Sequence, residues 1–497
     1  MAVECLIFCL ILEKFEKFCK KIGKSANNVV SLQTQNQCAM FVEFATHNFL
    51  SFKNEVAFSM LAAKSVKEGE AFPDGASNVF EIEDTGNKFV RIASIYGANG
   101  SGKSSLIKAM SFFRNMILGS VANDHILSGF SQNQFRLDAE SSKEPSGFQM
   151  IFIINKVKYR YGFEVFDERV DSEWLFQQEY SSQKESYCFK RANREIQINP
   201  KTFKEAKVIE NMSRDNALFL STAAQFNVPT ALLIKNWIAK RFNILSGIND
   251  NTLNFTALQY LQNETMRERI LNFIKIIDLG IQDIAVKENF IDNLSDSTTI
   301  PNDPLLKKIV GGISEAMNPS GNKIRELNIL AMHNKYEGDN VVDKVNFPFQ
   351  NESIGTVKIF ALLGPWLDTL ANGGILIVDE FGASIHTKLA LELIRLFQSK
   401  LNNGDAQLIV ATHDTNLLRK DLLRRDQIWF AEKDERGISD LYSLVEYKIN
   451  QATSVRNDAT FSKDYLLGKY GAIPYFGNIE KFIADYSVEN HEWQIWQ

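Results

Sequence analysis

Short apolar runs bounded by polar turns open the patterned part of the chain. Residues 41–45 and 56–60 have the composition of β-strands, and we expect them to pair beside a third strand at 90–95. Residues 106–113 instead place apolar side chains at helical spacing. A strand, a glycine-rich turn and a helix therefore follow one another in this region.

Four further β-rich runs come next. Residues 148–154 and 157–166 are divided by only two polar residues, which is a hairpin signal, and 172–180 and 187–191 form a second pair. We therefore expect residues 40–200 to form the N-terminal half of an α/β head that includes an antiparallel β-lobe.

The pattern then becomes helical. Residues 217–224, 231–242 and 266–277 carry apolar side chains at positions i, i+3 and i+4. Residues 288–325 are dense in Asn, Asp, Ser, Pro and Gly, which favours a loop. The segment 201–345 is therefore interpreted as a helical insertion with a flexible loop.

Strand-like apolar runs return in the last segment, 346–497. Residues 374–378 end in two carboxylates, and 407–411 end in Thr-His-Asp. A helix predicted at 357–370 precedes the first of these runs. This segment is expected to complete the α/β head.

The glycine-rich turn after 90–95 fits Gly-x4-Gly-Lys-Ser, the spacing of a phosphate-binding P-loop. Its glycines allow the backbone to curl around a phosphate, so that amide groups and the positive end of the helix point at the anion. Lys103 would reach the β- and γ-phosphates, and the Ser104 hydroxyl would hold Mg²⁺. The alternative, a glycine-rich turn with a chance lysine, is disfavoured by the flanking strand and helix. The residues expected around the phosphates are Gly97, Ala98, Asn99, Gly100, Ser101, Gly102, Lys103, Ser104 and Ser105.

Asp379 and Glu380 follow an apolar run typical of a buried parallel strand that delivers acids to its C-terminal edge. Asp379 would coordinate Mg²⁺ through its water shell, and Glu380 would polarise the attacking water. The alternative is a strand that merely ends in two solvated acids. More than half of the chain separates Lys103 from Asp379, which indicates a split ATP-binding-cassette (ABC) head rather than a compact GTPase or an AAA+ ring module.

Residues 351–356 lie where an ABC protein keeps its signature motif, just before the helix that leads into the acidic strand. Ser353 and the backbone of Gly355 and Thr356 would contact the γ-phosphate bound by the opposite subunit. An ordinary Ser/Thr helix cap is the alternative interpretation.

Two further residues are expected at the nucleotide. His413 leaves a strand shortly after the acidic strand, which suits a switch that touches the γ-phosphate, although a lone histidine is more often structural. Residues 381–386 occupy the place of the D-loop, which crosses the dimer interface in ABC ATPases, and Ser384 is its candidate nucleotide contact.

Composition limits the remaining possibilities. The 497 residues are 45% hydrophobic and 23% charged, as in soluble globular proteins, and no apolar run approaches the ~18 residues of a membrane span. The net charge of −5 gives no global signal for nucleic acid but allows a basic groove. Four of the five cysteines precede Met40, so a reducing cytoplasm is expected. Residues 1–39 are interpreted as an N-terminal extension, either a functional helix with its linker or the result of a start codon assigned too far upstream.

With these motifs, the chain resembles the OLD-like and SMC/RecF-like branch of ABC ATPases, and more narrowly the stand-alone ATP-binding protein of two-gene abortive-infection systems. The resemblance implies ATP and Mg²⁺ as ligands and a homodimer or higher assembly that controls a nuclease or Toprim-like effector from a neighbouring gene. Contact with nucleic acid is possible, and no membrane partner is implied. The motifs that carry the resemblance are 48–52, the P-loop, 352–356, the acidic strand, 411–414 and 465–474.

The sequence also departs from these relatives. True OLD nucleases continue into a C-terminal Toprim domain, whereas here only about sixty residues follow the strand at 429–434, and they read as a β-hairpin and a short helical tail. The Q-loop glutamine stays open among Gln132, Gln134 and Gln149. Two other functions remain: a DNA-repair ATPase that clamps DNA with a head dimer, and a toxin with a nuclease hidden in 160–345, a segment whose sole histidine is His333.

Overall fold

The computed structural model describes most of the chain. The described residues are 39–66, 77–82, 86–180, 182, 184–246, 250–277, 280–291, 324–400, 402, 406–449, 453–454 and 460–473. The expected extension 1–39, apart from Ala39, lies outside them, as do the four cysteines before Met40 and most of the expected loop 288–325.

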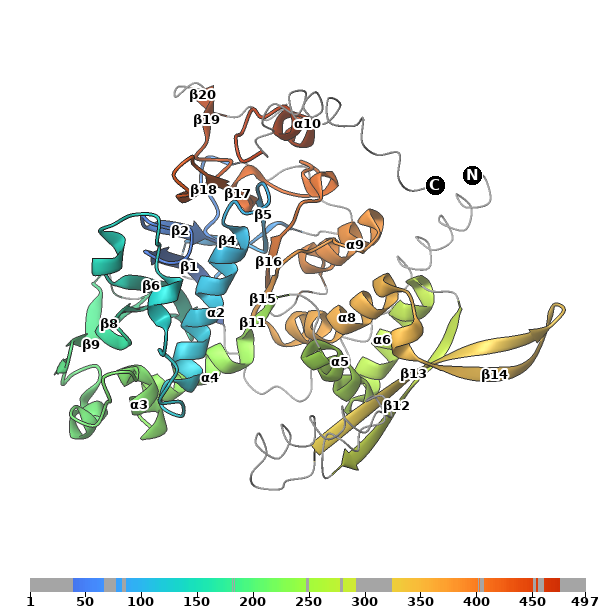
Figure 1. Ribbon diagram of the computed structural model, residues 1–497, viewed down its shortest axis with the longest axis horizontal. Helices are drawn as coiled ribbons and strands as arrows, with labels where there is room; N and C mark the ends of the chain where they lie inside the picture. The colour runs from blue at the N-terminus through green and yellow to red at the C-terminus, as the bar shows by residue number, and fades with distance from the viewer. Residues whose placement is uncertain are drawn as a thin grey trace, which may run out of the picture.

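A six-stranded sheet in the middle of the molecule carries the P-loop strand (Figure 1). Its order is β11-β15-β16-β5-β17-β18, and each neighbouring pair is parallel except β17 with β18. The P-loop strand and the acidic strand thus share one sheet although half of the chain separates them, so the predicted split α/β head is confirmed. The strands are β5 (Ile92–Tyr96), β11 (Phe242–Leu245), β15 (Ile375–Val378), β16 (Gln407–Ala411), β17 (Ile428–Lys433) and β18 (Ser439–Ser443).

The central strands β5, β15 and β16 are buried along their whole length. Their alternate side chains enter two different cores. Ile375 and Ile377 pack in the core that includes helix α2 (Lys103–Gly119), whereas Leu376 packs in the core that includes helix α8 (Ile354–Asn372). Burial on both faces explains why these strands read as unbroken apolar runs in the sequence.

A seven-stranded antiparallel sheet forms the β-lobe, in the order β10-β9-β8-β7-β6-β1-β2. The predicted pairing of 41–45 with 56–60 is confirmed as β1 with β2. Their expected position beside the P-loop strand is wrong, because β16 and β17 occupy the two edges of β5 and β1 pairs with β6 instead. The strands are β1 (Ala39–His47), β2 (Val56–Ser59), β6 (Ser146–Ile154), β7 (Val157–Phe166), β8 (Arg169–Glu179), β9 (Ser186–Ala192) and β10 (Glu195–Ile198).

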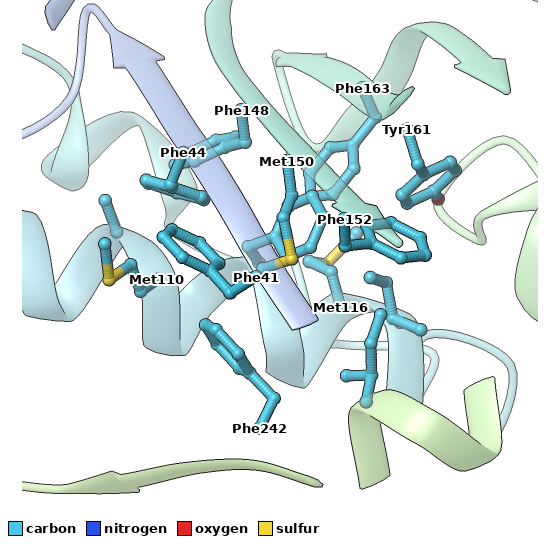
Figure 2. Close-up of a cluster of buried hydrophobic side chains, with 14 of the residues drawn as sticks. Phe41, Phe44, Met110, Met116, Phe148, Met150, Phe152, Tyr161, Phe163 and Phe242 are labelled. Carbon is cyan, nitrogen blue, oxygen red and sulfur yellow. The ribbon is translucent and has the colours of Figure 1, made fainter. Parts of the chain in front are cut away.

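Helix α2 is held between the two sheets by a cluster of aromatic and methionine side chains (Figure 2). Phe41 and Phe44 come from β1, Met110 and Met116 from α2, and Phe242 from β11, and all five are completely buried. Burial of each such side chain contributes about 1.5–3 kcal/mol. The cluster therefore fixes the helix that begins at the P-loop against both sheets.

The predicted helices at 217–224, 231–242 and 266–277 are confirmed as α3, α4 and α6. Helix α4 begins at Pro229, where the missing amide hydrogen costs no hydrogen bond. The full set of helices comprises α2, α3 (Phe219–Gln225), α4 (Pro229–Arg241), α5 (Asp250–Gln262), α6 (Glu264–Ile277), α8, α9 (Thr387–Gln398) and α10 (Phe461–Leu466) within the described residues.

The segment 201–345 is not purely helical, which corrects the expectation for it. It supplies β11 to the central sheet and most of a three-stranded antiparallel sheet, β12-β13-β14. In Figure 1, β13 and β14 extend away from the body as a long hairpin. The strands are β12 (Ile281–Ile291), β13 (Ile324–Glu337) and β14 (Asn340–Pro348), and two small pairs complete the fold, β3 (Val79–Glu81) with β4 (Lys88–Val90) and β19 (Lys448–Ile449) with β20 (Thr453–Ser454).

Helix α8 is long and apolar enough to satisfy the length and composition criteria for a membrane span, with a mean hydropathy of 1.3. This differs from the expectation that no apolar run approaches that length. Of the apolar window, 67% is buried inside the protein. Trp366 and Leu363, for example, are completely buried, so α8 has the environment of a core helix.

Candidate nucleotide-binding site

The P-loop connects β5 to α2 and leaves no space for side chains at two of its glycines. Gly97 has φ 151°, and a Cβ on it would lie 2.3 Å from the carbonyl oxygen of Ala431. Gly102 has φ 119°, and a Cβ there would lie 2.7 Å from Oγ of Ser439. These left-handed conformations and close approaches require glycine, so the loop is shaped by the β17–β18 hairpin as well as by its own sequence.

Lys103 is the first residue of α2 and is only 6% exposed. Its Nζ donates hydrogen bonds to the carbonyl oxygens of Gly97 (2.8 Å) and Ala98 (2.9 Å). Burial lowers the pKa of the ammonium to about 8, while the nearby carboxylates of Asp379 and Glu380 oppose this shift. The group is therefore mostly a cation at neutral pH, held inside the curl of the loop.

The acidic pair follows β15, which lies two strands away from β5. The amide of Asp379 donates to the carbonyl of Leu245 on β11 (2.9 Å), and the amide of Glu380 donates to Oδ1 of Asp379 (3.0 Å). Glu380 has φ 52°, a left-handed conformation that is uncommon for a residue other than glycine. Such a conformation costs about 1–3 kcal/mol and is often found at functional sites.

His413 follows β16, the strand between the acidic strand and the P-loop strand. Its neighbour Thr412 donates from Oγ1 to the carbonyl oxygen of Phe381 (2.6 Å), which ties this turn to the segment after Glu380. Burial, together with the Lys103 ammonium, lowers the pKa of His413, while Glu380 and Asp379 act in the opposite direction. The imidazole is therefore mostly neutral at pH 7 and can both donate and accept a hydrogen bond.

These elements enclose a cavity of about 490 Å³. It brings together residues that the sequence predicted from two distant segments, and it adds two lysines, Lys108 and Lys433, that no motif indicated. Lys433 could be found only from the sheet order, since β17 lies beside β5. The cavity is lined by Asn99, Gly100, Ser101, Gly102, Lys103, Ser104, Ser105, Lys108, Asp379, Glu380, Ala411, His413 and Lys433.

The donor set fits a magnesium nucleotide. The Ser104 hydroxyl and the Asp379 carboxylate, both oxygen ligands of the kind that Mg²⁺ prefers, line the same cavity. Oγ of Ser101 is buried without a hydrogen-bond partner in the described part of the chain, which is uncommon for a polar atom. Ser105 is positioned by Ser51, whose Oγ lies 3.0 Å from its own.

The predicted signature residues lie elsewhere in the same subunit. Ser353 caps α8 by accepting a hydrogen bond from the amide of Thr356 (3.0 Å), the interaction that the helix-cap interpretation requires. Gly355 lies against the D-loop, since a Cβ on it would be 3.0 Å from the carbonyl oxygen of Ser384. None of these four residues lines the cavity of its own subunit.

None of the three glutamines considered for a Q-loop lines the cavity. Gln134 is buried and donates to the carbonyl of Glu144 (2.9 Å). Gln149 accepts a hydrogen bond from the indole of Trp174 (3.0 Å). The structure thus engages Gln134 in the connection between α2 and β6, and Gln149 within the β-lobe.

The C-terminal tail packs against β17 and β18. Tyr470 is buried and its carbonyl accepts a hydrogen bond from the Tyr442 hydroxyl (2.8 Å). The amide of Ala472 donates to Oε1 of Glu432 (3.0 Å). Of the residues after 434, β18 pairs back onto β17, β19 and β20 form the predicted β-hairpin, and the predicted short helix is confirmed as α10, while Pro474 lies outside the described residues.

No curated protein matches the chain. Among solved structures, an SMC head bound to the C-winged helix domain of ScpA shares 14% identity, covering 81% of this chain and 97% of that one with a TM-score of 0.38. The SMC head domain from Thermotoga maritima shares 12%, covering 81% and 98% with a TM-score of 0.32. An SMC head with an extended coiled coil, bound to the C-terminal domain of ScpA derived from Pyrococcus furiosus, shares 13%, covering 82% and 96% with a TM-score of 0.33.

One family model matches residues 92–419, which is most of the chain. The match begins at β5 and ends after β16, so it includes the P-loop, the acidic pair and His413. On this match the chain belongs to the family described as "AAA domain, putative AbiEii toxin, Type IV TA system".

Proposed function

We propose that the protein is an ATP hydrolase, and the observation that carries this is the convergence of Lys103, the acidic pair and His413 on one cavity. The P-loop amides and Lys103 would hold the β- and γ-phosphates. Ser104 and Asp379 would hold Mg²⁺, which when bound neutralises phosphate charge. Glu380 would take the proton from the attacking water, and His413 would hydrogen-bond the γ-phosphate.

The first test removes the P-loop lysine. Lys103→Ala is expected to weaken ATP binding about 100-fold, because it deletes the side-chain charge closest to the β- and γ-phosphates. Binding is measured by calorimetry, with Lys420→Gln, an exposed lysine outside the cavity, as the matched control. Melting temperatures without nucleotide confirm that each variant folds. Wild-type ATP binding and turnover in Lys103→Ala would refute the proposed site.

We propose that the complete nucleotide site forms between two subunits. The signature residues do not reach their own cavity, and Ile354, at the start of α8, is 75% exposed. An exposed helix N-terminus next to the D-loop is able to receive a phosphate from another subunit. We therefore propose a homodimer or higher oligomer in which Ser353, Gly355, Thr356 and Ser384 act on the γ-phosphate bound by the partner.

The biological role proposed is the control of a nuclease effector in antiphage defence, in the cytoplasm. The family description, which names a toxin and a type IV toxin–antitoxin system, supports a two-gene setting of this kind. The ATPase would act as the sensor or regulator, and a neighbouring gene would supply the nuclease or Toprim-like partner.

The role is tested in cells that carry the chain together with its neighbouring gene. Phage plaque formation is expected to fall, and Lys103→Ala is expected to restore it, because the partner would no longer be controlled by ATP. Lys420→Gln should protect like the wild type. Protection that persists in Lys103→Ala would separate defence from this site, and sensitivity to DNA damage with no effect on phage would favour a DNA-repair ATPase.

A further inference from the structure

Lys433 lines the same cavity as Lys103 but lies on the opposite side of the P-loop from the acidic pair. The order of the central sheet is β15-β16-β5-β17. Asp379, Glu380 and His413 follow β15 and β16 on one side of the P-loop strand, whereas Lys433 ends β17 on the other. A chain of phosphates laid across the P-loop, with its γ-phosphate toward Glu380, therefore places its nucleoside end toward Lys433.

The backbone around Lys433 is fixed against the P-loop at two points. Two residues earlier, the carbonyl of Ala431 approaches Gly97 so closely that no Cβ fits there. Ser439, the cross-strand partner of Lys433 in the β17–β18 hairpin, lies against Gly102 in the same way. The Ser439 amide also donates to the carbonyl of Ser51 (2.7 Å). The backbone at Lys433 is thus held in place by its packing against the P-loop.

The charge of Lys433 is available to a ligand. In the described part of the chain Lys433 has no ion-pair partner, and its side chain is exposed at the cavity. The neighbouring carboxylate of Glu432 is held elsewhere, by the Tyr442 hydroxyl (3.0 Å) and the Ala472 amide (3.0 Å). Successive strand residues point to opposite faces, so this carboxylate is directed away from Lys433.

We propose that Lys433 binds the α- and β-phosphates of the nucleotide, a contact that rests on the nucleotide site proposed above. These phosphates are common to nucleoside di- and triphosphates. Lys433 therefore holds ATP and ADP alike, whereas Glu380 and His413, on the other side of the P-loop, act only at the γ-phosphate. An ammonium is well suited to this contact, since it makes charge-assisted hydrogen bonds with phosphate oxygens.

The test compares dissociation constants for ATP and ADP in the wild type, Lys433→Gln, Lys433→Arg and the control Lys420→Gln. Lys433→Gln is expected to weaken both nucleotides by about 10- to 100-fold, because one charge-assisted contact is lost from each. The ratio of the two constants should stay the same. Lys433→Arg, which keeps the charge, should restore most of the affinity, and Lys420→Gln should bind like the wild type.

Three outcomes are decisive. Unchanged affinity for both nucleotides in Lys433→Gln, with wild-type melting behaviour, would overturn the proposal. A loss confined to ATP would also overturn it, because it would place Lys433 at the γ-phosphate. A wild-type protein that binds neither nucleotide would instead contradict the proposed ATPase function, which keeps the two failures distinct.

Discussion

At the scale of single residues, the most informative side chain is Glu380, which combines an uncommon backbone with an exposed carboxylate. Its φ of 52° turns the chain directly after β15, so that Phe381 can donate to the carbonyl of Ala411 (2.9 Å). The turn places Glu380 in the cavity beside Asp379. Glycine adopts this backbone conformation without steric cost. The turn alone therefore does not require glutamate, so the side chain itself is the feature to test.

We expect Glu380→Gln to keep ATP binding and to lose hydrolysis. The amide preserves the shape of the side chain but cannot accept the proton of the attacking water, and loss of a general base typically lowers turnover by about 10²- to 10⁴-fold. Steady-state phosphate release and ATP affinity, measured on the same preparation, separate the two effects. Normal turnover in this variant would show that another group is the base. Glu435→Gln, an exposed carboxylate outside the cavity, is the matched control.

Residues in local motifs could be predicted from the sequence, because their chemistry depends on spacing along the chain. Lys103, Asp379 and His413 each follow or precede a recognisable strand, and the structure brings all three to one cavity. Lys433 carries no such signal. Its relation to the site depends on which strand lies beside β5, and that choice is made by packing between distant segments.

At the scale of secondary-structure elements, the wrong predictions also concern strands whose partners are distant in the sequence. The predicted helix 231–242 includes Phe242, because that residue continues the apolar periodicity of α4, whereas in the structure Phe242 begins strand β11. This segment becomes a strand through parallel pairing with β15, a partner more than a hundred residues away. The pairing of β1 with β6 rather than β5 has the same origin. The pairing of β6 with β7 was predicted correctly, because the two strands are neighbours in the sequence and form a hairpin.

Contacts between elements also link the start of α8 to the turn that follows Glu380. Nζ of Lys358, one turn into α8, donates to the carbonyl of Ala383 in the D-loop (2.6 Å). On the other side, Glu352 contacts Nε2 of His333 on β13 (2.8 Å). The start of α8 is therefore held between the D-loop and the projecting hairpin, and a displacement of either would reach the signature residues.

At the scale of the whole molecule, the described subunit brings the P-loop from Asn99 to Ser105, the acidic pair and His413 to one cavity but keeps the expected signature residues away from it. Closed two-fold assemblies bring the same surface of each subunit to its partner, so two signatures would complete two cavities. The proposed arrangement would make hydrolysis a property of the dimer. It also makes a specific prediction about mixtures of defective subunits.

Subunits carrying Lys103→Ala and subunits carrying Ser353→Arg should each be inactive alone and regain activity when combined. A heterodimer has one site with both defects and one site with an intact P-loop and an intact signature, so one of its two sites, about half of the total, should work. Arginine is chosen because it would clash with the incoming phosphate. Ser353→Ala is the matched control, because it removes the same cap hydrogen bond, at a cost of about 0.5–2 kcal/mol, without the clash. Turnover is measured on heterodimers purified through two different tags. Inactivity of a verified heterodimer would indicate that Ser353 only caps α8, and an active Ser353→Arg protein would exclude a signature that works on the partner's nucleotide.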